Sequence, residues 1–251
     1  MKINKTYNEN CLDTMSKMPN CFIDLGVTSP PYDSLRTYNG YSFDFEKIAK
    51  ELFRVIKDGG VIVWVISDST IKGSESGTSF RQALFFKEIG FNLHDTMIWI
   101  KDGGGAIGSN KCYTQNFEYM FVFSKGNPKS INLIYDKPNL SFGKDKSGVG
   151  RRLENGEHKI EKRKPSSEFS RRNNYWYIPV EKGIHPAVFP KLLAHDHILT
   201  WSNEADLVYD CFMGSGTTAK MCKQLNRNYV GSEISKEYCS IIEQKLNGEL
   251  F

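Results

Sequence analysis

The chain has 251 residues, 39% of them hydrophobic, which suits one α/β domain with a core and an insertion. No run of about 18 apolar residues is present, and no apolar segment follows the first five residues, so neither a membrane span nor a secretory signal is expected. The six cysteines form no C-x-x-C pair, which favours free thiols in a reducing cytoplasm over a disulfide framework or a zinc site.

The net charge of +4 is unevenly distributed along the chain. Residues 137–172 hold 11 Lys and Arg against 5 Asp and Glu, a local charge of +6, so the remainder carries −2. A basic stretch of this kind is typical of a loop that contacts nucleic-acid phosphates, although a solvated flexible loop has the same composition.

A buried strand is predicted at residues 21–27, and it leads into Thr28-Ser29-Pro30-Pro31-Tyr32. Each proline holds φ at about −65° and pushes the preceding residue toward extended geometry, which makes a stiff corner. The Ser29 hydroxyl, the Pro30 carbonyl and the Tyr32 ring would offer two hydrogen-bond acceptors and a stacking face. That set suits a flat, amino-bearing ring such as a nucleobase, and the simpler alternative is a proline-rich turn.

Strands and helices alternate in the next part of the chain, which predicts a parallel α/β sheet. The expected elements are a helix at 45–56, a strand at 61–66, a loop at 73–77, a helix at 80–89, and adjacent strands at 96–100 and 117–123. Gly59-Gly60 is expected to close the first helix and Gly90 to stop the second. Residues 67–69, at a strand end, would line a base pocket or cap a loop.

Periodicity fails between residues 124 and 180, where basic residues alternate with aromatic ones. Arginine and aromatic side chains together can hold phosphates and stack on bases. The candidate DNA-binding residues of this stretch are Arg151, Arg152, Arg171 and Arg172.

A second motif, residues 210–218, follows a predicted strand at 206–209 and has a Gly-x-Gly loop that lets a ligand approach the backbone. Beyond it we expect a helix at 217–225, a strand at 229–232 and a helix at 235–246. Glu233 lies 17 residues after Gly216, where an acid can accept both ribose hydroxyls of an adenosine cofactor or merely cap a helix. A further helix is expected from His185-Pro186 to about His197.

His195 and His197 invite a metal interpretation, but they stand two residues apart. At that spacing the two side chains point to different faces of a helix, and no third ligand is in reach along the sequence. No metal is therefore expected.

Together, the motifs at 28–32 and 210–218 resemble those of the amino-methylating DNA methyltransferases, which use S-adenosyl-L-methionine. Their order, catalytic motif first and cofactor motif last, resembles the beta group of that family. The resemblance implies an α/β, Rossmann-like sheet, mostly parallel with an antiparallel edge hairpin, helices on both faces and an irregular target-recognition insert. The implied parts are a catalytic part at 1–123, the insert at 124–180, and a cofactor-binding part at 181–251.

The resemblance also implies roles for individual residues. Catalysis would fall to Ser29, Pro30, Pro31 and Tyr32. Cofactor binding would fall to Asp210, Phe212, Gly214, Ser215, Gly216, Thr217, Thr218, Glu233, His185 and Pro186. Asn10 departs from the family, which usually has an acidic residue there, so no role is carried over to it.

The implied function is site-specific methylation of an exocyclic amino group on a flipped base of double-stranded DNA. Serine at the first catalytic position resembles the cytosine-N4 members, and adenine N6 is the alternative target. An inactive DNA-binding module and an RNA or protein amide methyltransferase are less favoured, because both motifs are intact and the insert is basic. A homodimer, a companion restriction nuclease and a cytoplasmic location in a prokaryote or phage-infected cell are compatible with this interpretation.

Overall fold

The computed structural model describes residues 1–31, 43–102, 112–144, 150–160, 166–181 and 189–248. The chain divides into two compact units, one made of Met1–Asn132 with Asn174–Phe251 and the other of Leu133–Asn173. Within the described residues, no helix is both long and apolar enough to cross a membrane.

The first unit is built on an eight-stranded sheet of order β1-β14-β13-β2-β3-β7-β6-β12. Neighbouring strands from β1 to β3 are parallel, β7 is antiparallel to both β3 and β6, and β12 is parallel to β6. The strands are β1 Lys5–Tyr7, β2 Ile23–Thr28, β3 Ile56–Ile66, β6 Asn92–Asp102, β7 Phe117–Ser124, β12 Tyr175–Pro179, β13 Leu207–Asp210 and β14 Asn228–Ser232.

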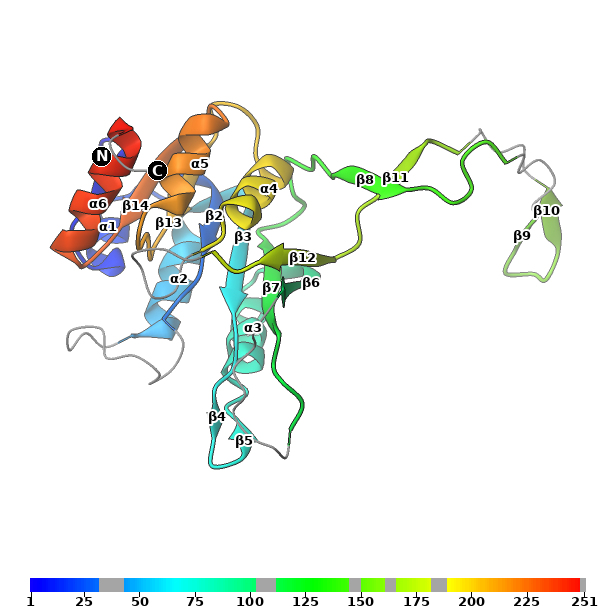
Figure 1. Ribbon diagram of the computed structural model, residues 1–251, viewed down its shortest axis with the longest axis horizontal. Coiled ribbons are helices and arrows are strands. Elements are labelled where there is room, and N and C mark those ends of the chain that lie inside the picture. Colours follow the sequence, from blue (N-terminus) through cyan, green and yellow to red (C-terminus); the bar gives the residue numbers. More distant parts are fainter. Residues whose placement is uncertain (32–42, 103–111, 145–149, 161–165, 182–188, 249–251) are drawn as a thin grey trace. The chain divides into compact units, whose positions relative to one another are not determined.

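Helices cover both faces of this sheet (Figure 1). They are α1 Cys11–Ser16, α2 Phe45–Val55, α3 Thr78–Glu88, α4 Lys191–Trp201, α5 Thr217–Gln224 and α6 Lys236–Asn247. Buried side chains of α4, α5 and α6 form one core with the sheet, and those of α1, α2 and α3 form the other. The predicted α/β fold with helices on both faces is confirmed.

Strand β3 shows why the sheet needs two covering layers. Val61, Val63 and Val65 belong to the core under α4–α6, whereas Ile62, Trp64 and Ile66 belong to the core under α1–α3. Side chains alternate between the two faces of a strand, so an uninterrupted apolar run is stable only where both faces are covered.

The prediction that Gly59-Gly60 closes the helix is wrong. Helix α2 ends at Val55, β3 begins directly at Ile56, and both glycines lie inside the strand. A Cβ on Gly60 would lie 2.9 Å from the backbone oxygen of Asp24 on β2, and Gly59 has a φ of +80°. Glycine is therefore required here by a bulge and a close approach between strands.

Strand β12 falls in the stretch where the sequence shows no periodicity. Trp176 and Ile178 are buried and their neighbours exposed, and the strand pairs with β6 beyond the antiparallel β6–β7 pair. The predicted hairpin is present, but it lies one strand in from the edge of the sheet.

Two smaller boundaries also differ from the predictions. The predicted loop at 73–77 holds part of a short antiparallel ribbon, β4 Thr70–Ile71 with β5 Ser74–Glu75. Helix α4 begins after Pro190 and continues to Trp201, whereas the sequence placed its start at His185. Proline at a helix start is favourable because its missing N–H would have no helical partner there.

The described residues of the second unit include two antiparallel ribbons. One pairs β8 Tyr135–Pro138 with β11 Phe169–Arg171, and the other pairs β9 Gly150–Arg152 with β10 His158–Ile160. The unit lies within the insert predicted at 124–180, and the assignment of that insert to target recognition stays a prediction.

Candidate functional site

Three parallel strands bring the two sequence motifs to one edge of the sheet. β13 pairs with β2 on one side, with Val208 opposite Leu25, and with β14 on the other, with Asp210 opposite Gly231. Parallel strands end at the same edge, where open α/β sheets bind ligands. The corner after β2, the loop after β13 and the residue after β14 therefore share that edge.

Thr28 directly precedes the corner after β2 and is only 2% exposed. Its hydroxyl donates to Asp210 Oδ1 at 2.7 Å, and Cys211 Sγ lies 3.5 Å from the same hydroxyl. Pro30 is buried, while Ser29 and Pro31 are half-buried. The fourth predicted catalytic residue, Tyr32, lies outside the described residues.

Asp210 is the buried centre of this arrangement. Besides Thr28, the Phe212 N–H donates to its Oδ1 at 3.0 Å, and the Thr218 hydroxyl donates to Oδ2 at 2.7 Å. Burial raises the pKa of Asp210, and these hydrogen bonds oppose that rise. Both carboxylate oxygens thus accept from the protein itself, where the sequence suggested a contact with the cofactor.

The glycine loop depends on left-handed backbone at two positions, φ +53° at Gly214 and φ +82° at Gly216. The Gly216 N–H donates to the Met213 carbonyl at 2.9 Å and closes a turn before α5. Lys245 Nζ on α6 donates to the Ser215 carbonyl at 2.9 Å, and this hydrogen bond attaches the loop to α6. Ser215, Thr217 and Thr218 are buried.

Glu233 follows β14 and reaches back to the loop. Its Oε2 accepts from the Gly214 N–H and its Oε1 from the Ser235 N–H, both at 2.8 Å. Burial raises the pKa of Glu233, and its two backbone hydrogen bonds work against that rise. The predicted carboxyl group therefore stands directly against the glycine loop.

Phe212 adds an aromatic side chain to the same edge. The ring is half-buried, with its centroid 5.7 Å from that of Phe43 and 6.3 Å from that of Trp64, both in edge-on geometry. An aromatic ring, left-handed glycines and a carboxyl group form a donor, acceptor and stacking set that fits an adenosine-type cofactor.

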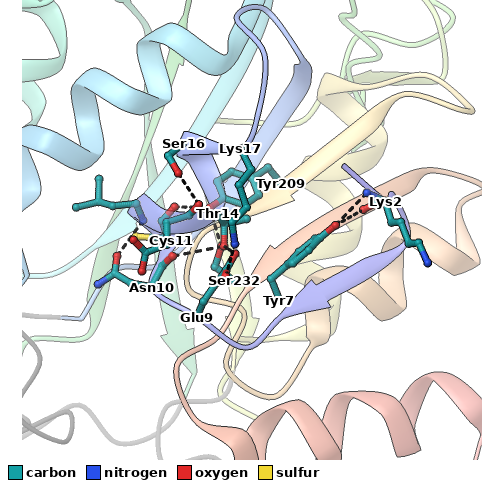
Figure 2. Close-up of polar contacts among 12 residues, drawn as sticks. Lys2, Tyr7, Glu9, Asn10, Cys11, Thr14, Ser16, Lys17, Tyr209 and Ser232 are labelled. Atoms are coloured by element: carbon teal, nitrogen blue, oxygen red, sulfur yellow. Dashed lines mark hydrogen bonds and ion pairs between the residues drawn. The ribbon is translucent and has the colours of Figure 1, made fainter.

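A polar cluster, which sequence reasoning missed, joins α1 to β13 and β14 (Figure 2). Tyr209 of β13 shares a 2.8 Å hydrogen bond with Ser232 of β14, and its hydroxyl lies 3.5 Å from the Cys11 carbonyl. Asn10 caps α1 by accepting from the Leu12 N–H at 2.9 Å. The sequence signal that could have placed Tyr209 inside is its position in the short run Leu207-Val208-Tyr209, which is buried throughout.

The polar residues after β3 act as caps. Asp68 is 6% exposed and accepts from the Ser76 hydroxyl at 2.9 Å, from the Ser79 N–H at 3.0 Å and from the Ser79 hydroxyl. The bond from the Ser79 N–H gives a partner to a backbone donor in the first turn of α3, which has no acceptor within the helix. Of the two interpretations open for this strand end, the structure supports capping.

The two histidines of α4 meet different partners. His195 Nδ1 lies 2.8 Å from Asp196 Oδ1, whereas His197 stacks at 4.5 Å between centroids on Trp176 and places Nε2 3.3 Å from the Met120 sulfur. The described part of the chain contains no group of three His, Cys, Asp or Glu side chains that could hold a metal. His185 and Pro186 lie outside the described residues.

Three of the four candidate DNA-binding arginines lie on strands of the second unit, and Arg172 directly follows β11. Arg172 forms an ion pair with Asp136, its Nε 2.9 Å from Oδ2, and this hydrogen bond lowers the pKa of Asp136. Arg171 is exposed. Arg151 and Arg152 lie on β9, and only their backbone is described. Arg172 therefore stabilises the β8–β11 ribbon.

All six cysteines are free. Burial raises the pKa of Cys211, beside the corner, well above its ordinary value. Burial likewise raises the pKa of Cys11 to about 12 and that of Cys239 to about 11. These thiols are consequently poor sources of a nucleophilic thiolate at neutral pH.

Comparison with known proteins shows the family of this chain. The family model N6_N4_Mtase, described as DNA methylase, matches residues 23–244. The chain is 56% identical over 237 residues to the orphan methyltransferase M.BamHII of Bacillus amyloliquefaciens, a match that covers 90% of this chain and 89% of the relative.

Two solved structures share the fold. The cytosine-N4-specific PvuII DNA methyltransferase superposes with a TM-score of 0.71 at 20% identity, covering 95% of this chain and 84% of that chain. A DNA modification methylase of Thermus thermophilus, complexed with S-adenosyl-L-methionine, has a TM-score of 0.67 at 20% identity, covering 98% and 93%. The chain belongs to the N6_N4_Mtase family and is an S-adenosylmethionine-dependent DNA methyltransferase.

Proposed function

We propose that this methyltransferase modifies the 4-amino group of cytosine in double-stranded DNA, at a specific site. The observation that carries the proposal is the 2.7 Å hydrogen bond between Thr28 and Asp210. It joins the residue before Ser29-Pro30 to the first residue of the cofactor motif. An acceptor for the amino group and a binding loop for the methyl donor therefore stand next to each other.

The cofactor side of the reaction is assigned to the glycine loop and Glu233. The loop offers backbone that a ligand can approach closely at Gly214, and Glu233 offers carboxylate oxygens for the two ribose hydroxyls. Phe212 offers an aromatic face. S-adenosyl-L-methionine, when bound, supplies an electrophilic methyl group on a positively charged sulfur.

The acceptor side is assigned to the corner after β2. The target base has to leave the duplex stack before its amino group can be reached. Ser29 and the Pro30 carbonyl accept hydrogen bonds from that amino group and turn its lone pair toward the methyl group, while Tyr32 stacks on the ring. The nitrogen forms the new bond to the methyl carbon, the carbon–sulfur bond breaks, and the amino proton then leaves to water.

This direct route needs no enzyme nucleophile. Methylation at carbon 5 of cytosine would proceed through a covalent intermediate with a protein nucleophile. Cys211 is the cysteine nearest the corner, and it is 2% exposed with its pKa raised by burial. The chemistry available at this edge is therefore positioning of two bound reactants, which can supply a large part of a rate enhancement.

Cytosine is preferred as the target because serine stands at the first catalytic position, and adenine N6 is the second candidate. Binding of the DNA is assigned to the basic second unit, where Arg171 is exposed and available to phosphates; such contacts would position the duplex. A homodimer, a companion nuclease and a cytoplasmic location stay predictions.

Nucleoside mass spectrometry of DNA methylated by the purified protein tests the target. N4-methylcytosine is expected, N6-methyladenine would refute the choice of base alone, and 5-methylcytosine would refute the mechanism. Tyr32→Ala should slow turnover by an amount equivalent to a stacking energy of about 1–3 kcal/mol, with cofactor affinity nearly unchanged. Tyr32→Phe keeps the ring and serves as the control, so equal losses in both variants would contradict stacking.

A further inference from the structure

We infer that Asp210 is a positioning residue, which holds the acceptor corner at a set distance from the cofactor loop through the hydroxyls of Thr28 and Thr218. The inference rests on the proposed function, since it concerns the alignment of the same two reactants. It assigns to Asp210 a role in the methyl-transfer step that is separate from contact with the cofactor.

The three residues stand at the junction of three elements. Thr28 is the last residue of β2 and directly precedes the corner, Asp210 is the last residue of β13, and Thr218 lies in the first turn of α5. The two hydroxyl–carboxylate distances are both 2.7 Å. Asp210 also accepts from the Phe212 N–H at 3.0 Å, and this bond fixes the backbone where the glycine loop begins.

Burial strengthens these hydrogen bonds and keeps water from replacing them. Thr28, Asp210 and Thr218 are 2%, 5% and 1% exposed, so water has little access to replace a lost partner. Hydrogen bonds to a charged group are stronger than neutral ones, and a low local dielectric strengthens them further. A carboxylate fixed by three donors on three segments leaves little freedom for these segments to move independently.

The contrast with Glu233 separates positioning from binding. Glu233 is half-buried beside the loop, so its carboxylate has room to accept from a ligand as well. Both carboxylates accept from protein donors at both oxygens, but Asp210 is only 5% exposed and has no comparable room for a ligand. Loss of the Thr28 hydroxyl should therefore leave the binding loop formed, with Thr218 and Phe212 still bonded, and release only the corner.

The consequence is kinetic, because displacement of reacting groups by about 1 Å can cost roughly 100-fold in rate. Thr28→Val keeps the shape of the side chain and removes the hydroxyl. It should lower the single-turnover methylation rate by about tenfold or more, while the calorimetric Kd for S-adenosyl-L-methionine changes by less than about twofold. Thr28→Ser restores the hydroxyl and should recover most of the rate.

Thr200→Val is the matched control for a buried threonine hydroxyl. Thr200 is 4% exposed, and its hydroxyl donates to the Asp196 carbonyl at 2.7 Å within α4 itself. It should lower the unfolding midpoint, by less than Thr28→Val because its acceptor is a neutral carbonyl, and leave the methylation rate unchanged. Should Thr28→Val fail to fold, Thr218→Val tests the other half of the bridge, with the same loss of rate expected.

Two results would overturn the inference. If Thr28→Val and Thr200→Val methylate DNA at the same rate while the wild-type protein is active, the bridge has no positioning role and the proposed function stands. If the wild-type protein binds the cofactor yet transfers no methyl group to an amino nitrogen of DNA, the proposed function fails and the inference falls with it.

Discussion

Gly216 should tolerate no side chain, and the structure allows the cost of Gly216→Ala to be worked out. The residue has a φ of +82°, and a Cβ placed there would lie 2.7 Å from Cγ1 of Ile242 on α6 and 3.1 Å from its Cγ2. Left-handed backbone costs an alanine about 1–2 kcal/mol. Forcing extra atoms into a packed core adds about 1–3 kcal/mol. The expected loss of unfolding free energy is therefore about 2–5 kcal/mol.

Gly248 provides a control for the backbone term. It has a φ of +81°, almost the same as Gly216, but among the described residues, its chain neighbours apart, no atom lies within 4 Å of the position that its Cβ would take. Gly248→Ala should thus lose only the backbone part, about 1–2 kcal/mol. Urea unfolding of both variants in the same buffer measures the difference, which isolates the contact with Ile242.

Calorimetry gives a second measurement on the same pair. Gly216→Ala should also weaken binding of S-adenosyl-L-methionine, because the glycine loop has to shift away from α6, while Gly248→Ala should bind normally. Equal losses of stability in the two variants would refute the packing argument. Ile242→Ala combined with Gly216→Ala should cost less than the sum of the single changes, because the clashing methyl groups are gone.

Three further outcomes are expected. Burial raises the pKa of Glu233 above its ordinary value of 4.5. In the proposed role of Glu233, the ribose hydroxyls would donate to its ionised form. Cofactor affinity should therefore be full above that raised pKa and decline as the pH falls through it, whereas Glu233→Gln should show a flat calorimetric profile; the same decline in the variant would exclude this carboxyl. Replacing Arg151 and Arg152 by alanine should weaken DNA binding and flatten the dependence of affinity on salt, and an unchanged slope in filter-binding assays would mean that neither meets phosphate. Tyr209→Phe, which removes the hydrogen bond to Ser232, should lower the free energy of unfolding by about 0.5–1.5 kcal/mol in urea titrations, and no loss would show the bond to be without net value.

The amino-acid sequence by itself determined the local features of this protein. Pro30 and Pro31 restrict their own backbone angles, and glycines at 214 and 216 permit the left-handed angles that the structure shows. Apolar runs such as residues 61–66 need cover on both faces wherever they lie. These properties depend on a residue and its close neighbours. The α/β fold and the position of the two motifs could therefore be predicted from the sequence.

Only the tertiary structure decided which distant residues meet. The order of strands sets β2 against β13, and this alone lets Thr28 reach Asp210, 182 positions along the chain. Packing of the sheet also turned Asp210 toward protein donors and required Gly60 beside the backbone of β2, and pairing of β8 with β11 brought Arg172 to Asp136. Such contacts depend on sheet order and on the close approach of separate segments. Neither produces a periodic pattern in the sequence from which the contact could be predicted.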